Sequence, residues 1–124
     1  MKAKVMIVDD DPTVLHVVTR LLRRNDIEVV SADSGEACLK KLSEGFKGLI
    51  LMDIIMPKMD GWETIQKIVA KGYTEGVLIC MLTGQGEPDR KMDGLKEYVL
   101  DYIRKPFDNQ KLLTIVNEYL SYLK

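Results

Sequence analysis

The chain has 124 residues, the length of one ordinary domain, and its 46% hydrophobic and 30% charged residues are typical of a globular protein. Because 18 basic and 19 acidic side chains nearly cancel, we do not expect binding to nucleic acid through bulk electrostatics. The apolar runs are strand-sized, whereas a membrane helix needs about 18 apolar residues, and two cysteines are too few for a disulfide framework. We therefore expect a single cytoplasmic domain over residues 1–124, with neither membrane nor nucleic acid as a direct partner.

Five short apolar runs predict β-strands. They lie at 5–8, 27–30, 49–52, 77–82 and, more weakly, 102–103. Runs that are apolar throughout suit strands covered on both faces, as in a parallel sheet. Only the run at 27–30 alternates, which predicts an edge strand.

Helical spacing of apolar residues fills the intervals between these runs. The predicted helices lie at 14–22, 33–42, 62–69, 88–96 and 112–123. Asp60 and Asp108 precede the third and last of them as candidate N-caps. The segment 88–96 offers only two apolar anchors and is predicted to be the least stable. Five alternations of strand and helix predict an α/β fold with a parallel sheet between two layers of helices.

Polar side chains follow four of the five predicted strands. Asp9 and Asp10 come after the first strand, Asp53 after the third, Thr83 after the fourth and Lys105 after the fifth. In an open α/β sheet, ligands bind beyond the carboxyl ends of the strands. The sequence therefore predicts a site at that edge of the sheet.

The residue types at this edge indicate phosphoryl chemistry. Clustered carboxylates raise one another's pKa values unless a cation lies between them, and Mg²⁺ prefers such oxygen ligands together with phosphate oxygens. A carboxylate beside Mg²⁺ can accept a phosphoryl group as an aspartyl phosphate. Lys105 would supply positive charge and Thr83 a hydrogen bond to a phosphoryl oxygen.

Four motifs in order carry a resemblance to a known family. They are VDDDP at 8–12, MDIIMPKMDG at 52–61, LTG at 82–84 and KPF at 105–107. Over essentially its whole length the sequence resembles the receiver domains of two-component response regulators, of the chemotaxis-regulator type. The resemblance implies a flavodoxin-like fold with strand order 2-1-3-4-5 and a receiver domain over 1–124, with no output domain in these residues.

The resemblance also implies a role for each residue at the acidic edge. Asp53 would be the phosphoacceptor and a ligand of Mg²⁺, and Asp10 would bind the metal directly. Asp9 would act through water or by orienting the ligand shell. The backbone carbonyl of Ile55 would complete the protein ligands.

Three further residues would form the switch that responds to phosphorylation. Thr83 would be the switch hydroxyl, Lys105 the cation that contacts the phosphoryl group, and Tyr102 an aromatic side chain that changes rotamer. The Lys105–Pro106 peptide bond would be cis.

As a receiver, the protein would take its phosphoryl group from the phosphohistidine of a histidine kinase or phosphotransfer protein. It would catalyse only its own phosphorylation and dephosphorylation, and so would not be an enzyme in the usual sense. Phosphorylation would change the face formed by the fourth helix, fifth strand and fifth helix, which contacts a downstream protein or output domain. A phosphorylation-dependent dimer is left open.

The sequence departs from the family pattern at two places. Glu97 to Leu100 stand where the family usually has Gly-Ala, and these bulkier residues predict a reshaped junction between the fourth helix and the fifth strand, which is part of the partner surface. Ile55 is apolar at a position that flanks the attacking water, which predicts slow self-dephosphorylation.

Three alternative functions share parts of this pattern. A phosphatase of the haloacid dehalogenase type needs a second aspartate two residues after its nucleophile, where this chain has Ile55. A flavin or nucleotide module would need a loop rich in Ser, Thr or Gly at 9–11, where this chain has three acids. A pseudo-receiver that binds proteins without being phosphorylated stays open. Asp9 and Asp10 also fit a purely structural interpretation, as caps of the first helix.

Overall fold

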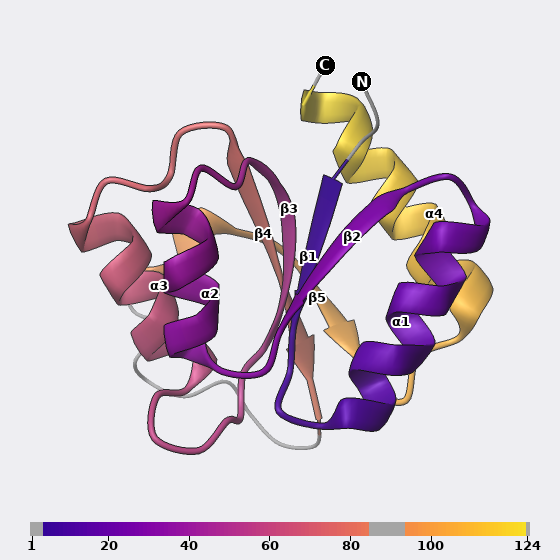
Figure 1. Ribbon diagram of the computed structural model, residues 1–124, viewed down its shortest axis with the longest axis horizontal. Helices are drawn as coiled ribbons and strands as arrows, with labels where there is room; N and C mark the ends of the chain where they lie inside the picture. Colours follow the sequence, from indigo (N-terminus) through magenta and orange to yellow (C-terminus); the bar gives the residue numbers. More distant parts are fainter. Residues whose placement is uncertain (1–3, 85–93, 124) are drawn as a thin grey trace.

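The computed structural model describes residues 4–84 and 94–123, in which strands and helices alternate along the chain (Figure 1). Five strands form one sheet, with the bounds β1 (Lys4–Val8), β2 (Glu28–Ala32), β3 (Gly48–Asp53), β4 (Val77–Thr83) and β5 (Val99–Arg104). Neighbouring strands are parallel, and their order is β2-β1-β3-β4-β5. The predicted strand order is therefore confirmed, and β2, whose sequence alternates, lies at an edge as predicted.

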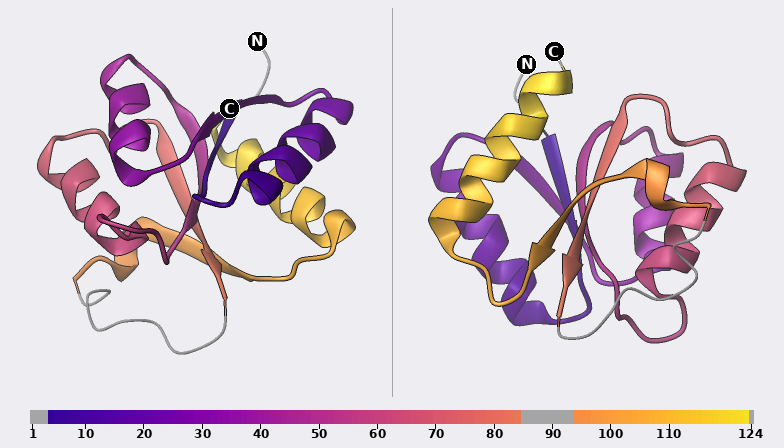
Figure 2. Two further views of the ribbon diagram at one scale, coloured as in Figure 1. Left: turned by 60° about the horizontal axis from the view of Figure 1, so that its bottom comes forward. Right: turned by 180° about the vertical axis from the view of Figure 1, so that it is seen from behind.

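Helices cover both faces of the sheet and make the three predicted layers (Figures 1 and 2). The α-helices of the described residues are α1 (Pro12–Arg24), α2 (Gly35–Ser43), α3 (Gly61–Ala70) and α4 (Asn109–Leu120), and two short 3₁₀ turns are η2 (Lys96–Tyr98) and η3 (Ser121–Leu123). α1 and α4 pack on one face, and α2 and α3 pack on the other. The helix predicted at 88–96 falls mostly on positions 85–93, which lie outside the described residues.

Polar side chains cap the N-termini of the helices. Asp11 is the N-cap of α1 and accepts a hydrogen bond from the backbone N–H of Thr13 at 2.9 Å. Asp60 and Glu63 form a capping box at the start of α3, in which each side chain accepts from the other residue's backbone N–H. Asp108 caps α4. The caps predicted at Asp60 and Asp108 are confirmed.

Two apolar cores lie on opposite faces of the sheet. The core under α1 and α4 includes Val5, Ile7, Val18, Leu22, Leu49, Leu51, Leu112 and Val116. The core under α2 and α3 includes Met6, Val8, Cys38, Leu42, Ile50, Met52, Ile65 and Ile68. Successive residues of β1 and β3 therefore enter different cores, which explains why these strands are apolar throughout rather than alternating.

The last strand is longer than the sequence predicts. Its apolar signal covers 102–103, whereas β5 extends over Val99–Arg104 at the edge of the sheet. Leu100, Tyr102 and Arg104 are exposed there, so the strand lacks the continuous apolar run of its buried neighbours. Among the described residues, no helix is both long enough and apolar enough to cross a membrane.

Candidate functional site

The carboxyl ends of the strands bring the predicted site residues to one edge of the sheet. Asp9 directly follows β1, Asp53 is the last residue of β3, Thr83 is the last residue of β4, and Lys105 directly follows β5. The strand register brings these residues to the same end of the sheet, because Asp53 pairs with Leu82 and Thr83 pairs with Arg104. The Lys105 N–H donates to the Thr83 carbonyl at 2.6 Å, which continues the ladder past the last strand pair.

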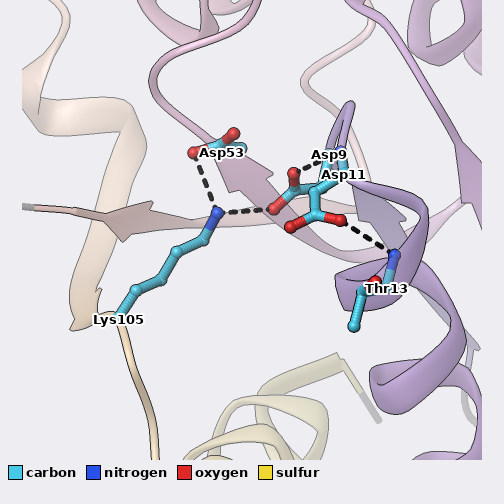
Figure 3. Close-up of polar contacts among 5 residues, drawn as sticks. All are labelled: Asp9, Asp11, Thr13, Asp53 and Lys105. Atoms are coloured by element: carbon cyan, nitrogen blue, oxygen red, sulfur yellow. Dashed lines mark hydrogen bonds and ion pairs between the residues drawn. The ribbon is translucent and has the colours of Figure 1, made fainter.

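The Lys105 ammonium lies between two buried carboxylates (Figure 3). Its Nζ is 2.7 Å from Asp9 Oδ2 and 3.4 Å from Asp53 Oδ1. The Asp9 side chain is fully buried and the Asp53 side chain is 8% exposed. Because charges so far from water are costly unless they are paired, the lysine stabilises both carboxylates.

The Asp9 carboxylate has a second hydrogen-bond partner besides Lys105. Its Oδ1 accepts a hydrogen bond from the backbone N–H of Asp11 at 2.9 Å. Asp11 in turn caps α1, so the cap role does not fall to Asp9 or Asp10. The interpretation of those two acids as helix caps is wrong, since the geometry gives that role to the residue that follows them.

Three carboxylates gather close enough to share one metal ion. Asp9, Asp10 and Asp53 each offer an oxygen, and these atoms all lie within 4.8 Å of one another. Asp10 is exposed and the other two are buried. Against one ammonium, three acids leave an excess of negative charge. Hard oxygen donors, one of them exposed to solvent, fit Mg²⁺, which keeps some of its waters.

The pKa of Asp53 supports the same conclusion. Burial, followed by the charge of Asp9, raises the pKa of this carboxyl group to about 6. The charge and hydrogen bond of Lys105, together with a hydrogen bond from the Ile55 backbone, lower this pKa without outweighing the first two effects. The charge of Lys105 thus does not fully offset burial and the charge of Asp9, and a bound cation would add to that offset.

The pKa of Lys105 moves the opposite way from that of an ordinary buried amine. Burial lowers it, but the hydrogen bond to Asp9 and the charges of Asp53 and Asp9 outweigh burial and raise the pKa above its usual value. The side chain therefore stays an ammonium and can contact an anionic group at this edge.

Comparison with known proteins identifies the family. The family model described as the response regulator receiver domain matches residues 5–117, which is most of the chain. The chain belongs to the response regulator receiver domain family. This receiver domain therefore takes part in two-component signalling, in which members of the family act with histidine kinases and output domains.

Curated relatives are similar over most of this receiver domain. Protein PilH of Pseudomonas aeruginosa is 27% identical, and the match covers 96% of the chain and 98% of PilH. The chemotaxis protein CheY of Listeria monocytogenes is 32% identical, with 89% and 92% covered. The transcriptional regulatory protein CpxR homolog of Haemophilus influenzae is 33% identical over 95% of the chain. The chain spans only 50% of that regulator's length.

Solved structures share the fold. A CheY-like response regulator receiver domain protein from Methanospirillum hungatei is 46% identical, with a TM-score of 0.95 over 99% of this chain and 98% of that one. The chemotaxis protein CheY4 of Vibrio cholerae is 28% identical, with a TM-score of 0.84 over 95% and 98% of the two chains. The flavodoxin-like, CheY-type fold implied by the sequence motifs is therefore confirmed.

The loop after β3 places Ile55 beside Asp53. Ile55 hydrogen-bonds Asp53 through its backbone, and 71% of its residue surface is exposed. Gly61 closes the loop, where its N–H donates to the Ile54 carbonyl at 2.7 Å. A Cβ atom at this glycine would lie 2.5 Å from the Asp53 carbonyl oxygen, so no larger residue fits without moving the site. The metal-binding role of the Ile55 carbonyl stays a prediction.

The two predicted switch residues lie on adjacent strands. Thr83 is half-buried at the end of β4, and Tyr102 on β5 is 37% exposed. The structure also shows the predicted cis peptide bond between Lys105 and Pro106. Sequence reasoning missed one neighbour of Tyr102: the Trp62 ring, whose centroid lies 6.4 Å from that of Tyr102. The sequence predicts a helix over 62–69 and gives no signal of a contact between Trp62 and the last strand.

Proposed function

We propose that this receiver domain accepts a phosphoryl group on Asp53 from the phosphohistidine of a histidine kinase or phosphotransfer protein, in the cytoplasm and with Mg²⁺ bound. It then acts as a switch that catalyses only its own phosphorylation and dephosphorylation. The observation that carries this proposal is the gathering of Asp53, two further carboxylates and the Lys105 ammonium at the carboxyl edge of the sheet.

Asp10 and Asp53 would hold the metal through their carboxylates, Ile55 through its backbone carbonyl, and Asp9 through water or by orienting the ligand shell. When bound, Mg²⁺ would offset negative charge on the carboxylates and on the incoming phosphoryl oxygens. The donor set supports this assignment, since its oxygen atoms lie within reach of one ion and include two buried carboxylates.

The transfer itself needs a positioned nucleophile and compensated charge. An Asp53 carboxylate oxygen attacks phosphorus as the bond from phosphorus to the histidine nitrogen breaks, and the electron pair of that bond stays on the imidazole. Lys105, whose Nζ already lies 3.4 Å from Asp53, shifts to contact a phosphoryl oxygen. Thr83 donates its hydroxyl hydrogen to another phosphoryl oxygen.

The phosphoryl group then changes the surface that partners bind. New negative charge at Asp53 attracts both the Thr83 hydroxyl and the Lys105 ammonium. Because a backbone hydrogen bond joins these two residues, the segments that carry them are expected to move together. As Thr83 moves toward the phosphoryl group, the Tyr102 side chain turns inward into the space that Thr83 leaves. The face that includes β5 and α4 changes, and a downstream protein or output domain detects that change.

Intact-protein mass tests this proposal. Incubation with acetyl phosphate and Mg²⁺ is expected to add one phosphoryl group to the wild type, and no group to Asp53→Asn or in the presence of a chelator. Asp11→Asn is a matched control, because Asp11 lies beside the site but caps α1, and it is expected to keep the mass gain. An unchanged wild-type mass with both acetyl phosphate and a phosphorylated histidine kinase would favour a pseudo-receiver and overturn the proposal.

A further inference from the structure

The indole of Trp62 carries a buried polar group that makes no hydrogen bond. Trp62 is fully buried, and its Nε1–H is the one buried side-chain polar group in residues 4–84 and 94–123 that lacks a hydrogen-bond partner. A buried tryptophan N–H usually finds an acceptor, and leaving it without one costs free energy. Such an exception in a folded protein calls for an explanation. A second conformation that supplies an acceptor would be favoured by this donor.

The position of Trp62 is tied to the acidic site. It is the second residue of α3, directly after Gly61, whose N–H binds the Ile54 carbonyl next to Asp53. The Asp60 capping box anchors the same turn. The indole therefore sits on backbone that cannot move without disturbing the loop that carries Asp53, so it is a fixed element rather than a mobile one.

Tyr102 is the aromatic neighbour that can supply an acceptor. The two ring centroids are 6.4 Å apart and the planes are tilted by 44°, within the range of about 4.5–7 Å at which aromatic pairs attract. Tyr102 is still 37% exposed, so an inward turn would remove more of its side chain from solvent. Its backbone N–H is held by Asp101 Oδ1 at 2.8 Å, which leaves the side-chain torsions free to change while the strand stays in place.

We propose that Trp62 is a positioning residue for the switch: when Tyr102 turns inward, its ring packs against the indole and its hydroxyl oxygen accepts a hydrogen bond from Nε1–H. This inference rests on the proposed function, since phosphorylation of Asp53 drives the turn. Burial already raises the pKa of Tyr102, so the hydroxyl stays protonated. The unpartnered donor then favours the inward conformation, which is paired, over the outward one.

The chain contains one tryptophan, so its indole N–H gives a single resonance in an amide-correlation NMR spectrum. We expect acetyl phosphate and Mg²⁺ to move this proton downfield and to slow its exchange with solvent by about tenfold, or ~1.4 kcal/mol. In Tyr102→Phe, which keeps the ring but removes the acceptor, the downfield shift is expected to be lost. Phosphorylation of every sample is measured by intact mass, so that only phosphorylated proteins are compared.

The outcomes separate the two proposals. If the wild type gains a phosphoryl group but the indole resonance stays in place, or if it moves equally in Tyr102→Phe, the role of Trp62 is overturned and the proposed function stands. If the wild type gains no phosphoryl group from acetyl phosphate or from a phosphorylated kinase, the proposed function falls and this inference falls with it. A shift that depends on the Tyr102 hydroxyl supports both.

Discussion

The surroundings of Asp53 make its carboxyl group a weaker acid than an ordinary aspartate. Burial and the charge of Asp9 raise its pKa to about 6, whereas an aspartate in an unfolded chain has a pKa of about 3.9. The folded state therefore binds the proton more tightly. This contribution to stability is complete below about pH 4 and is lost as the pH rises through 6.

Replacing this acid by a neutral isostere is expected to stabilise the metal-free protein. In a chelator at pH 7, Asp53→Asn should raise the free energy of unfolding by up to about 3 kcal/mol, because two pKa units correspond to roughly that energy. Urea denaturation from pH 4 to pH 7 measures the effect, and the gain should grow with pH. Asp33→Asn, at an exposed aspartate, is the control. A variant that is less stable than the wild type at pH 7 would contradict the account.

Ile55 is expected to set how long the phosphoryl group lasts. Its apolar side chain is largely exposed next to Asp53 and cannot orient an attacking water. Ile55→Asn, which can hydrogen-bond a water, should speed dephosphorylation by about tenfold, or ~1.4 kcal/mol in the barrier. Loss of phosphorylated mass with time measures this rate, and Ile55→Val should leave it close to that of the wild type. An unchanged rate in Ile55→Asn would show that this side chain does not control the lifetime.

At the scale of elements, the capping box of α3 links helix stability to the site. Asp60→Ala removes the hydrogen bond to the Glu63 N–H at 2.8 Å and should lower the free energy of unfolding by about 1 kcal/mol. Urea denaturation gives the change. Gln66→Ala, at an exposed position of the same helix, should stay within about 0.5 kcal/mol of the wild type. Equal free energies of unfolding for Asp60→Ala and the wild type would show that the Asp60 cap does not stabilise the protein.

The elements differ in how well their sequences predict them. β1, β3 and β4 are covered on both faces, so their apolar runs identify them with bounds close to those observed. β5 lies at an edge and exposes Leu100 and Tyr102, so its sequence shows only its centre. How clearly the sequence predicts a strand therefore depends on whether one or both of its faces are buried against apolar residues.

At the scale of the molecule, the parallel sheet explains why the site could be predicted at all. Once four polar residues follow four strands, parallel order places them at one edge, and the structure brings Asp9, Asp53 and Lys105 within ion-pair distance. The pairing of Lys105 with Asp9 rather than mainly with Asp53 could not be predicted, because it depends on side-chain torsions. The contact of Trp62 with Tyr102 depends on how α3 packs against the edge strand, which no local spacing encodes.

A metal that binds only the folded state stabilises the whole molecule. Mg²⁺ at one hundred times its dissociation constant should raise the free energy of unfolding by about 2.7 kcal/mol. Thermal denaturation at increasing MgCl₂, matched in ionic strength with NaCl, measures the change. Asp10→Asn should weaken the dependence on Mg²⁺, whereas Asp33→Asn should keep it. A wild type that is indifferent to Mg²⁺ would contradict the assignment of Asp9, Asp10 and Asp53 as a metal site.

The most direct measurement maps the acceptor itself. After incubation with acetyl phosphate and Mg²⁺, borohydride reduces an aspartyl phosphate to homoserine, and peptide mass spectrometry locates the converted residue. We expect conversion at position 53 alone, and no conversion when the chelator is present. Conversion at Asp9 or Asp10, or a phosphoryl group that resists borohydride on another side chain, would show that Asp53 is not the phosphoacceptor.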